Sequence, residues 1–570
     1  MKKHILKIQI ALVIILIALL ILPSRRAFAD TPQIPPGASA EVIEKKARED
    51  IEERLKETKP IFKSLVEPEE PAEEAPSQTE FYVRTIRLEG NKILPEKDVH
   101  SLLSVFEKRK QTLDDLKRLC RQLEAEYQKR GYVAIVYLPP QRLEKQDVKL
   151  EAVVSKLGEV HSEGAHYFRD DQTKSYWRIP KGSVLRYDQI RTDTMRMNQN
   201  PDRAVRASLR PGKKKGDTDV YLQVKDRSPL HSGLSLDSQG TKLTGKNRPS
   251  FNVRNNNFTG HDDIFLGSAA FTQDLGTVYL YHMLPLPKWD LRVATHFSHA
   301  QVNPKKGFER IGYDGVSQDY GTEIRRWLFQ RDNATLDGYA GFKFNEKRTR
   351  AFSAVIARDR LRTPYFGVAL QSADSHGIWD LDENWTFGLP FHDDQIALTS
   401  RQAGSSFSKF EFQVKRIEKL PWWKTSVMFK IQGQWTRDNL TPQEEFFIGG
   451  VDTVRGYPES DYGGDYGLCT NIEYWVPAYF IPKSWKVMNS KDSLRSQTSL
   501  VLFLDQGYAH LISPLSGEHV SRSLLGAGFE IQFRINENFD ARYGWGFPLG
   551  DVSLTEAGRS QQYFKVQSNY

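Results

Sequence analysis

The feature that most constrains this chain is a two-residue alternation of apolar and polar side chains, which recurs from about Pro229 to the carboxyl terminus. The alternating segments are about ten residues long, and polar stretches rich in glycine and asparagine separate them. No strong helical periodicity appears in this region. Because successive side chains of a strand point to opposite faces, each segment predicts a strand with one apolar and one polar face. Such segments include those at Leu291, Val427, Ala527 and Phe539.

Strand length and aromatic residues favour a membrane β-barrel over a soluble β-sandwich, which shows the same alternation. A tilted strand crosses a bilayer with about ten residues. Tryptophans stand at segment ends, at Trp289, Trp422, Trp423 and Trp435, where the interfacial girdles of barrels lie. In hydrocarbon every backbone donor and acceptor must be paired, so such strands must close on themselves. At roughly 20 residues per strand and loop, residues 229–570 predict about sixteen antiparallel strands.

Composition excludes several other classes of protein. Hydrophobic residues make up 39% of the chain, too few for a polytopic helical membrane protein, while 11% aromatic residues are too many for a disordered one. The formal net charge of +8 is small for 570 residues, so we expect no nucleic-acid partner. The two cysteines, Cys120 and Cys469, cannot build a disulfide framework or a thiolate metal site. We expect no metal and no cofactor.

The amino terminus predicts export from the cytoplasm. A basic start at Lys2, Lys3 and Lys7 precedes an almost wholly apolar run over residues 8–22, and the small residues Ala27 and Ala29 flank Phe28 at its end. This order is typical of a secretory signal peptide, residues 1–29, with cleavage after Ala29. The alternative is a retained single-span anchor.

Two segments of unusual composition follow the signal peptide. Residues 30–57 include a densely charged stretch in which Ile43, Ala47, Ile51 and Leu55 recur every four residues, which predicts a helix with one thin apolar stripe. Residues 58–80 combine four prolines with six glutamates, which predicts an extended linker. The helix is too polar for a core element, so it lies either in a polar cavity or free in solvent.

Two compact α+β modules are predicted next, over residues 81–157 and 158–228. In the first, a capping box at Thr112–Asp115 starts a helix that ends at Gly131, and Cys120 on its apolar face is expected to be a buried thiol. In the second, Tyr187–Met197 has helical spacing. Two strands then flank a lysine-rich turn, which we interpret as a solvated hairpin tip rather than a nucleic-acid patch.

Two motifs inside the barrel region carry a resemblance. A long loop contains Val454-Arg455-Gly456-Tyr457, and a second stretch, near the end of a strand, contains Phe503-x-Asp505-x-Gly507. This pair resembles the signatures of the outer-membrane barrels that move or insert proteins. The resemblance implies that the loop folds back into the barrel and that Arg455 pairs with Asp505 on the inner wall. It also implies that Gly456 allows a tight loop tip, with Tyr457 packed beside it.

The amino-terminal half narrows the resemblance to the two-partner-secretion transporters, the haemolysin and hemagglutinin exporters. A charged helix, a linker, two modules and a barrel stand in the order typical of that family, and the modules resemble its POTRA domains. The chain departs from the usual pattern at Ser568, where barrel-targeting signals often have an aromatic residue. The module resemblance depends on two turn motifs, formed by Pro139, Pro140 and Gln141 and by Pro211 and Gly212.

The resemblance implies an outer-membrane transporter of a Gram-negative bacterium that exports one large adhesin- or haemolysin-type partner without ATP. The modules would lie in the periplasm and bind the unfolded partner by β-augmentation, and the charged helix would plug the lumen. Further expected partners are outer-membrane lipid, periplasmic chaperones and the barrel-assembly machinery, with a monomeric barrel. The alternatives are an insertase of the same superfamily and a passive porin. An enzyme is not expected, because hydrolase and metalloprotease motifs are absent from the sequence and no catalytic residues are predicted.

Overall fold

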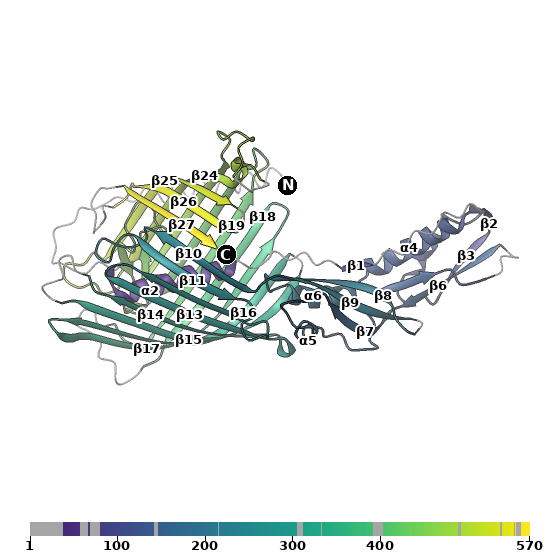
Figure 1. The fold of residues 1–570 in the computed structure, drawn as a ribbon, viewed down its shortest axis with the longest axis horizontal. Helices are drawn as coiled ribbons and strands as arrows, with labels where there is room; N and C mark the ends of the chain where they lie inside the picture. Colours follow the sequence, from purple (N-terminus) through teal and green to yellow (C-terminus); the bar gives the residue numbers. More distant parts are fainter. Residues whose placement is uncertain are drawn as a thin grey trace.

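The computed structural model describes residues 38–57, 66–68, 80–141, 146–214, 216–304, 312–331, 333–390, 403–487, 492–535, 538–551, 553 and 560–569. The predicted signal peptide, residues 1–29, and most of the predicted linker, residues 58–80, lie outside these ranges. Figure 1 shows a wide barrel, a helix inside it and an elongated arm of two modules at one of its ends. We call that end of the barrel the module end and the opposite one the distal end.

The barrel is closed, and the described strands that form it number 16, which confirms the predicted fold class. Each strand pairs antiparallel with its neighbours, and the first and last strands close the ring from Gly233 opposite Asn569 to Asp237 opposite Lys565. In order, the strands are β10 (Leu230–Asp237), β11 (Arg248–Asn255), β12 (Ile264–Phe271), β13 (Leu275–Leu286), β14 (Leu291–Val302), β15 (Asp314–Arg331), β16 (Ala334–Ala351), β17 (Ala354–Ala373), β18 (Gly377–Gly388), β19 (Phe407–Lys419), β20 (Ser426–Thr436), β23 (Tyr466–Pro477), β24 (Thr498–His510), β25 (Ser521–Ile535), β26 (Phe539–Pro548) and β27 (Gln561–Asn569).

The residues that alternate in the sequence form the inner and outer faces of this barrel. On β17, Asp359 and Tyr365 face the lumen and are buried, whereas Phe366 and Val368 on the outer face are exposed. A membrane barrel needs this arrangement, because its outer face contacts lipid and its interior is polar. Among the helices that the structure describes, none combines the length and apolar character that crossing a membrane would require.

Module 1 packs two helices against small sheets. Its elements are β2 (Phe81–Val83), β3 (Thr85–Glu89), α3 (Glu96–Leu103), β4 (Arg109–Gln111), α4 (Leu113–Lys129), β5 (Ala134–Tyr137) and β6 (Asp147–Val154). The capping box is confirmed, because the Thr112 side chain accepts from the Asp115 backbone while the Asp115 carboxylate accepts from the Thr112 backbone. Cys120 lies buried in the core between Leu116 and Leu123, as expected.

Module 2 contains β7 (Lys156–Glu163), α5 (Asp170–Lys174), α6 (Tyr187–Met197), β8 (Arg203–Pro211) and β9 (Asp217–Asp226). Its sheet has the order β1-β8-β9-β7, and β1 (Val66–Pro68) comes from the predicted linker. Strand β1 pairs in parallel with β8, Val66 opposite Ala207. The edge of β8 is therefore covered by a segment that precedes both modules in the chain.

The loop between β20 and β23 is the longest connection that enters the barrel. It contains two short strands, β21 (Phe446–Ile448) and β22 (Tyr462–Gly464), which pair with each other. The helix α2 (Ala40–Glu57) also lies inside the barrel (Figure 1). Two short elements complete the described fold, the 3-10 turn η2 (Pro287–Trp289) and α7 (Leu494–Gln497).

Candidate functional site

The structure brings Arg455 of the long loop against Asp505 on the inner wall. The guanidinium donates to both carboxylate oxygens, from Nε to Oδ2 at 2.6 Å and from Nη2 to Oδ1 at 2.7 Å. The Arg455 backbone N–H adds a third hydrogen bond to Oδ2 at 3.1 Å. Arg455 is 5% exposed and Asp505 is fully buried. Asp505 lies in the middle of β24 (Thr498–His510), so its expected place near the end of a strand is wrong.

Three neighbours of this pair complete the cluster. Glu473 on β23 accepts from Arg455 Nη1 at 2.6 Å, so one guanidinium faces two carboxylates. Asn471 on the same strand donates to Asp505 Oδ1 at 2.8 Å and to the backbone of the loop. The guanidinium carbon lies 3.8 Å from the centre of the Phe503 ring, close enough for a cation–π contact. Sequence reasoning missed Glu473 and Asn471, although their inward register on β23 follows from the alternation.

The loop tip fits a wall made of glycines. Gly456 has φ +100°, a left-handed conformation that favours glycine, and the tip lies against the backbone of Phe547 on β26. A Cβ atom at Gly526 would overlap the Arg455 carbonyl oxygen, and one at Gly546 would overlap the Gly456 backbone. The wall thus approaches the loop closely because these positions lack side chains.

The other predicted motif residues surround the same tip. Val454 is fully buried, and a Cβ atom at Gly507 would meet its side chain. The Tyr457 hydroxyl accepts from the Gly550 backbone at 3.1 Å and donates to the Leu525 carbonyl at 3.3 Å. Both sequence motifs, which are about 50 residues apart in the chain, therefore meet in one buried cluster.

Helix α2 lies against β13, β14 and β15 and uses its thin apolar stripe to do so. Ala40 and Ile43 pack with Leu275 and Val302. About two turns later, Ile51 packs with residues of β12 and β13. This stripe explains how a helix of such polar composition is held in a polar interior.

Ion pairs and hydrogen bonds tie α2 both to the wall and to the long loop. Lys46 forms an ion pair with Glu459 of the loop, and Lys45 donates to the Glu445 carbonyl at 2.9 Å. On the wall side, Glu41 pairs with Lys347, and Glu44 accepts from Ser298. The helix therefore contacts the same loop that carries Arg455.

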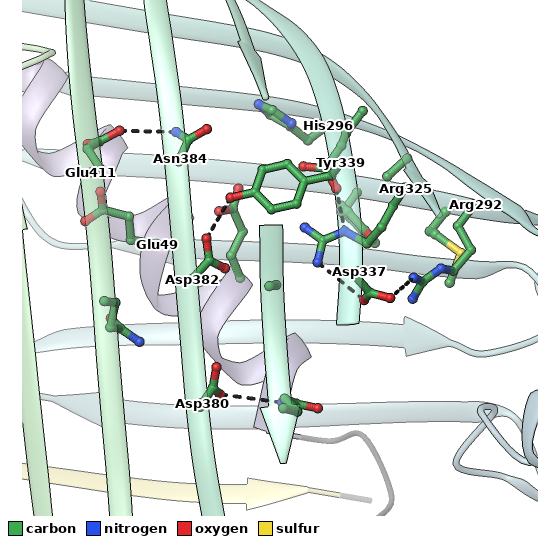
Figure 2. Close-up of a pocket in the computed structure, with 18 of the residues that line it drawn as sticks. Glu49, Arg292, His296, Arg325, Asp337, Tyr339, Asp380, Asp382, Asn384 and Glu411 are labelled. Carbon is green, nitrogen blue, oxygen red and sulfur yellow. Dashed lines mark hydrogen bonds and ion pairs between the residues drawn. The ribbon is translucent and has the colours of Figure 1, made fainter. Parts of the chain in front are cut away.

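A cavity of about 520 Å³ lies between α2, module 2 and the inner wall. Figure 2 shows that charged and polar side chains line it. Arg292 donates to Asp337 at 2.9 Å, and Tyr339 donates to Asp382 at 2.6 Å. Among the described residues, no three histidine, cysteine, aspartate or glutamate side chains are grouped so that they could hold a metal ion. Charged side chains of both signs line the cavity together with apolar and aromatic ones, among them Met283, Trp327 and Phe446.

Module 2 docks onto two turns at the module end of the barrel. Asp262, in the turn between β11 and β12, is buried and accepts from Arg203 at 2.9 Å and from Tyr176 at 2.5 Å. Asp290, in the next turn, accepts from Arg178 and Arg196 of module 2. Within the module, burial raises the pKa of the Asp193 carboxyl to about 6.

The predicted module turns lie in the arm, apart from the luminal loop. Gln141, after Pro139 and Pro140, exchanges two hydrogen bonds of 2.8 Å with the Lys149 backbone and so holds its turn to β6. Pro211 ends β8, and the Gly212 N–H donates to the Asp217 carbonyl at 2.9 Å across the following hairpin. These contacts give both motifs a structural explanation.

Comparison with known proteins now identifies the family. Residues 216–532, more than half of the chain, match the family model described as haemolysin secretion/activation protein ShlB/FhaC/HecB. The chain belongs to this family. Residues 81–154 match the ShlB-type POTRA domain, which covers module 1. ShlB/FhaC/HecB proteins are transporters rather than enzymes, and the predicted resemblance to two-partner-secretion transporters is confirmed.

Individual relatives agree with this assignment. The chain is 22% identical over 391 residues to the heme/hemopexin transporter protein HuxB of Haemophilus influenzae strain 86-028NP, covering 65% of this chain and 67% of HuxB. It is 29% identical over 456 residues to the outer membrane transporter CdiB-2 of Burkholderia pseudomallei strain 1026b, covering 74% of this chain and 71% of CdiB-2.

Solved structures show the same fold. CdiB from Escherichia coli is similar with a TM-score of 0.67 at 17% identity, covering 95% of this chain and all of CdiB. BamA from Haemophilus ducreyi, lacking POTRA domains 1–3, is similar with a TM-score of 0.56 at 14% identity, covering 86% of this chain and all of that one. The family match and the named relatives make the chain a two-partner-secretion transporter of the outer membrane, with its modules in the periplasm. The module end of the barrel faces the periplasm, and the distal end faces the cell surface.

Proposed function

We propose that this transporter exports one large, unfolded exoprotein of the adhesin or haemolysin type through its barrel, and that the described conformation is its closed resting state. The observation that carries the proposal is that the lumen holds both α2 and the latched loop, which contact each other through Lys46 and Glu459. Relatives are named transporters of hemolysin and of heme/hemopexin, which supports a protein client of this class. Export needs no nucleotide. The client folds outside the cell, and folding there removes the unfolded chain that could slide back through the barrel.

Client recognition begins at the edge of module 2. An extended client strand adds to an exposed sheet edge by pairing with its backbone. Strand β1 now occupies the β8 edge, so a client that pairs with β8 must displace β1. Only eight residues separate the end of α2 from the start of β1 in the chain. Displacement of β1 therefore pulls on α2, the helix that fills the lumen.

The Arg455–Asp505 cluster acts as the latch of the long loop. Its bidentate geometry fixes the loop tip against β24 and β25, and burial keeps water from competing for the guanidinium. Release of α2 removes the Lys46 contact from the loop but leaves the latch intact. The latch therefore holds one wall of the pathway in place while the helix leaves.

Secretion of a partner exoprotein by cells that produce this transporter tests the proposal. Arg455→Ala and Asp505→Ala are each expected to reduce the exoprotein in the medium severely, while heat-modifiable migration on gels stays that of an inserted barrel. Arg416→Ala is the matched control, because Arg416 pairs with Asp374 at the periplasmic surface, away from the loop. Unchanged secretion by both latch variants would overturn the latch. An insertase would instead show itself by loss of many outer-membrane proteins when the gene is deleted.

A further inference from the structure

Four arginines gather on the outer, lipid-facing side of β16 and β17. We call them the arginine patch: Arg348, Arg358, Arg360 and Arg362. On both strands the inward residues have odd numbers, as shown by buried Asn345 and Lys347 on β16 and buried Asp359 on β17, so the patch residues face outward. Strand β16 starts at the periplasmic end, which places the patch toward the cell surface.

The patch begins where the apolar outer band ends. Toward the periplasm, the outward positions of β16 and β17 are apolar, among them Phe342 and Phe366, which are 43% and 52% exposed. Phe344 stands opposite Arg362 in the register, and the Arg362 guanidinium lies over the Phe344 ring at 5.4 Å. An arginine in hydrocarbon is costly, whereas at the headgroup level it meets phosphate groups. The register therefore puts the patch beside the headgroups of the outer leaflet.

Like charges face each other within the patch. Arg348 stands directly opposite Arg358, an arrangement that destabilises a sheet unless an anion compensates it. On the same outer face of β16, Glu346 accepts two hydrogen bonds from Arg358, at 2.6 and 3.0 Å, and its carboxylate lies 3.6 Å from the Arg360 Nε atom. In the part of the chain that the structure describes, Arg348 forms no ion pair, and its Nε atom is buried without a hydrogen-bond acceptor.

We propose that the arginine patch binds the phosphate groups of a phosphorylated glycolipid of the outer leaflet, lipid A of lipopolysaccharide. A guanidinium binds a phosphate through two parallel hydrogen bonds, and Arg348 and Arg358 would share one phosphate between them. The phosphate supplies the negative charge that Arg348 lacks, since Arg358 is already paired with Glu346. The Phe344 and Phe366 rings below then contact the acyl chains of the same lipid.

Titration of the delipidated full-length protein in zwitterionic detergent with diphosphorylated lipid A tests this site, with native mass spectrometry as the readout. Combined Arg348→Gln and Arg358→Gln are expected to weaken lipid A binding at least about ten-fold, because two charge-assisted contacts are lost. The matched control combines Arg326→Gln and Arg331→Gln, two exposed arginines near the periplasmic end of β15. The control is expected to bind within about two-fold of the unchanged protein.

A second pair of substitutions and a folding control separate loss of the binding site from other effects of the substitutions. Combined Arg348→Lys and Arg358→Lys keep both charges but lose the guanidinium fork, so they are expected to bind with intermediate affinity. Heat-modifiable migration must stay unchanged in all variants, which separates loss of the site from misfolding. Equal lipid A affinity in the patch variant and the control would overturn the proposal, and so would phosphatidylglycerol competing as well as lipid A. The proposal concerns the outer face alone, so it stands or falls independently of client export.

Discussion

The strongest test of the latch is Asp505→Asn, which removes one buried charge and keeps the side-chain volume. Asp505 accepts three hydrogen bonds from Arg455, at 2.6, 2.7 and 3.1 Å. Breaking a buried ion pair costs about 3–5 kcal/mol, and the remaining Glu473 partner places the cost near 3 kcal/mol. At about 1.4 kcal/mol per ten-fold, the open loop should become more populated by about two orders of magnitude.

Hydrogen exchange of the peptide that covers residues 446–457 measures this population, because exchange of a protected amide follows local opening. The Arg455 amide reports directly, since it donates to Asp505. Asp374→Asn is the control, because that carboxylate pairs with Arg416 at the surface, and an exposed pair is expected to change exchange there about five-fold or less. If hydrogen exchange of the loop peptide in Asp505→Asn is less than about three-fold faster, the reasoning is refuted. Removing one charge of a buried ion pair should cost more free energy than such a small change reports.

Three other outcomes are expected. Gly526→Ala should displace the loop tip and expose it to trypsin, because the new methyl group overlaps the loop backbone, whereas Gly276→Ala, with open space around it, should leave cleavage unchanged. Lys46→Glu should raise single-channel conductance by repelling Glu459 and loosening α2, and combination with Glu459→Lys should restore the low value; no recovery in the exchanged pair would argue against this contact. The carboxyl of Asp193 binds a proton more readily in folded module 2 than in the unfolded chain, so the module should lose stability as the pH rises from about 4 to about 6 and no further above, and thermal unfolding of Asp193→Asn should lack this dependence.

Local patterns predicted most of the architecture. The alternation of apolar and polar residues predicted where the strands of the barrel lie, because each strand has one face toward lipid and one toward water. The capping box placed the start of α4 at Thr112, and the helical spacing of Tyr187–Met197 coincides with α6. These features depend on neighbours within a few residues, which a sequence displays directly.

The residues that join the latch from other strands could not be predicted from the sequence. Glu473 and Asn471 join the latch because β23 lies beside β24 in register, Asn471 opposite Asp505. The glycine wall at Gly526 and Gly546 is recognisable only once the loop lies against it. The misplacement of Asp505 near a strand end has the same origin, since the alternation of β24 does not mark how far the strand continues.

The strands of the barrel differ greatly in length, and this has a consequence for the surrounding membrane. β10, β11 and β12 have 8 residues each, whereas β16 has 18 and β17 has 20. Eight residues tilted by about 40° rise only about 20 Å, less than the apolar band of about 25 Å that a bilayer offers. Lipids next to the closure of β10 with β27 must therefore shorten or splay, while those beside β16 and β17 keep their full thickness. The transporter thus imposes a thickness gradient on its own annulus of lipid, with the pinched side at the place where the ring of strands is joined.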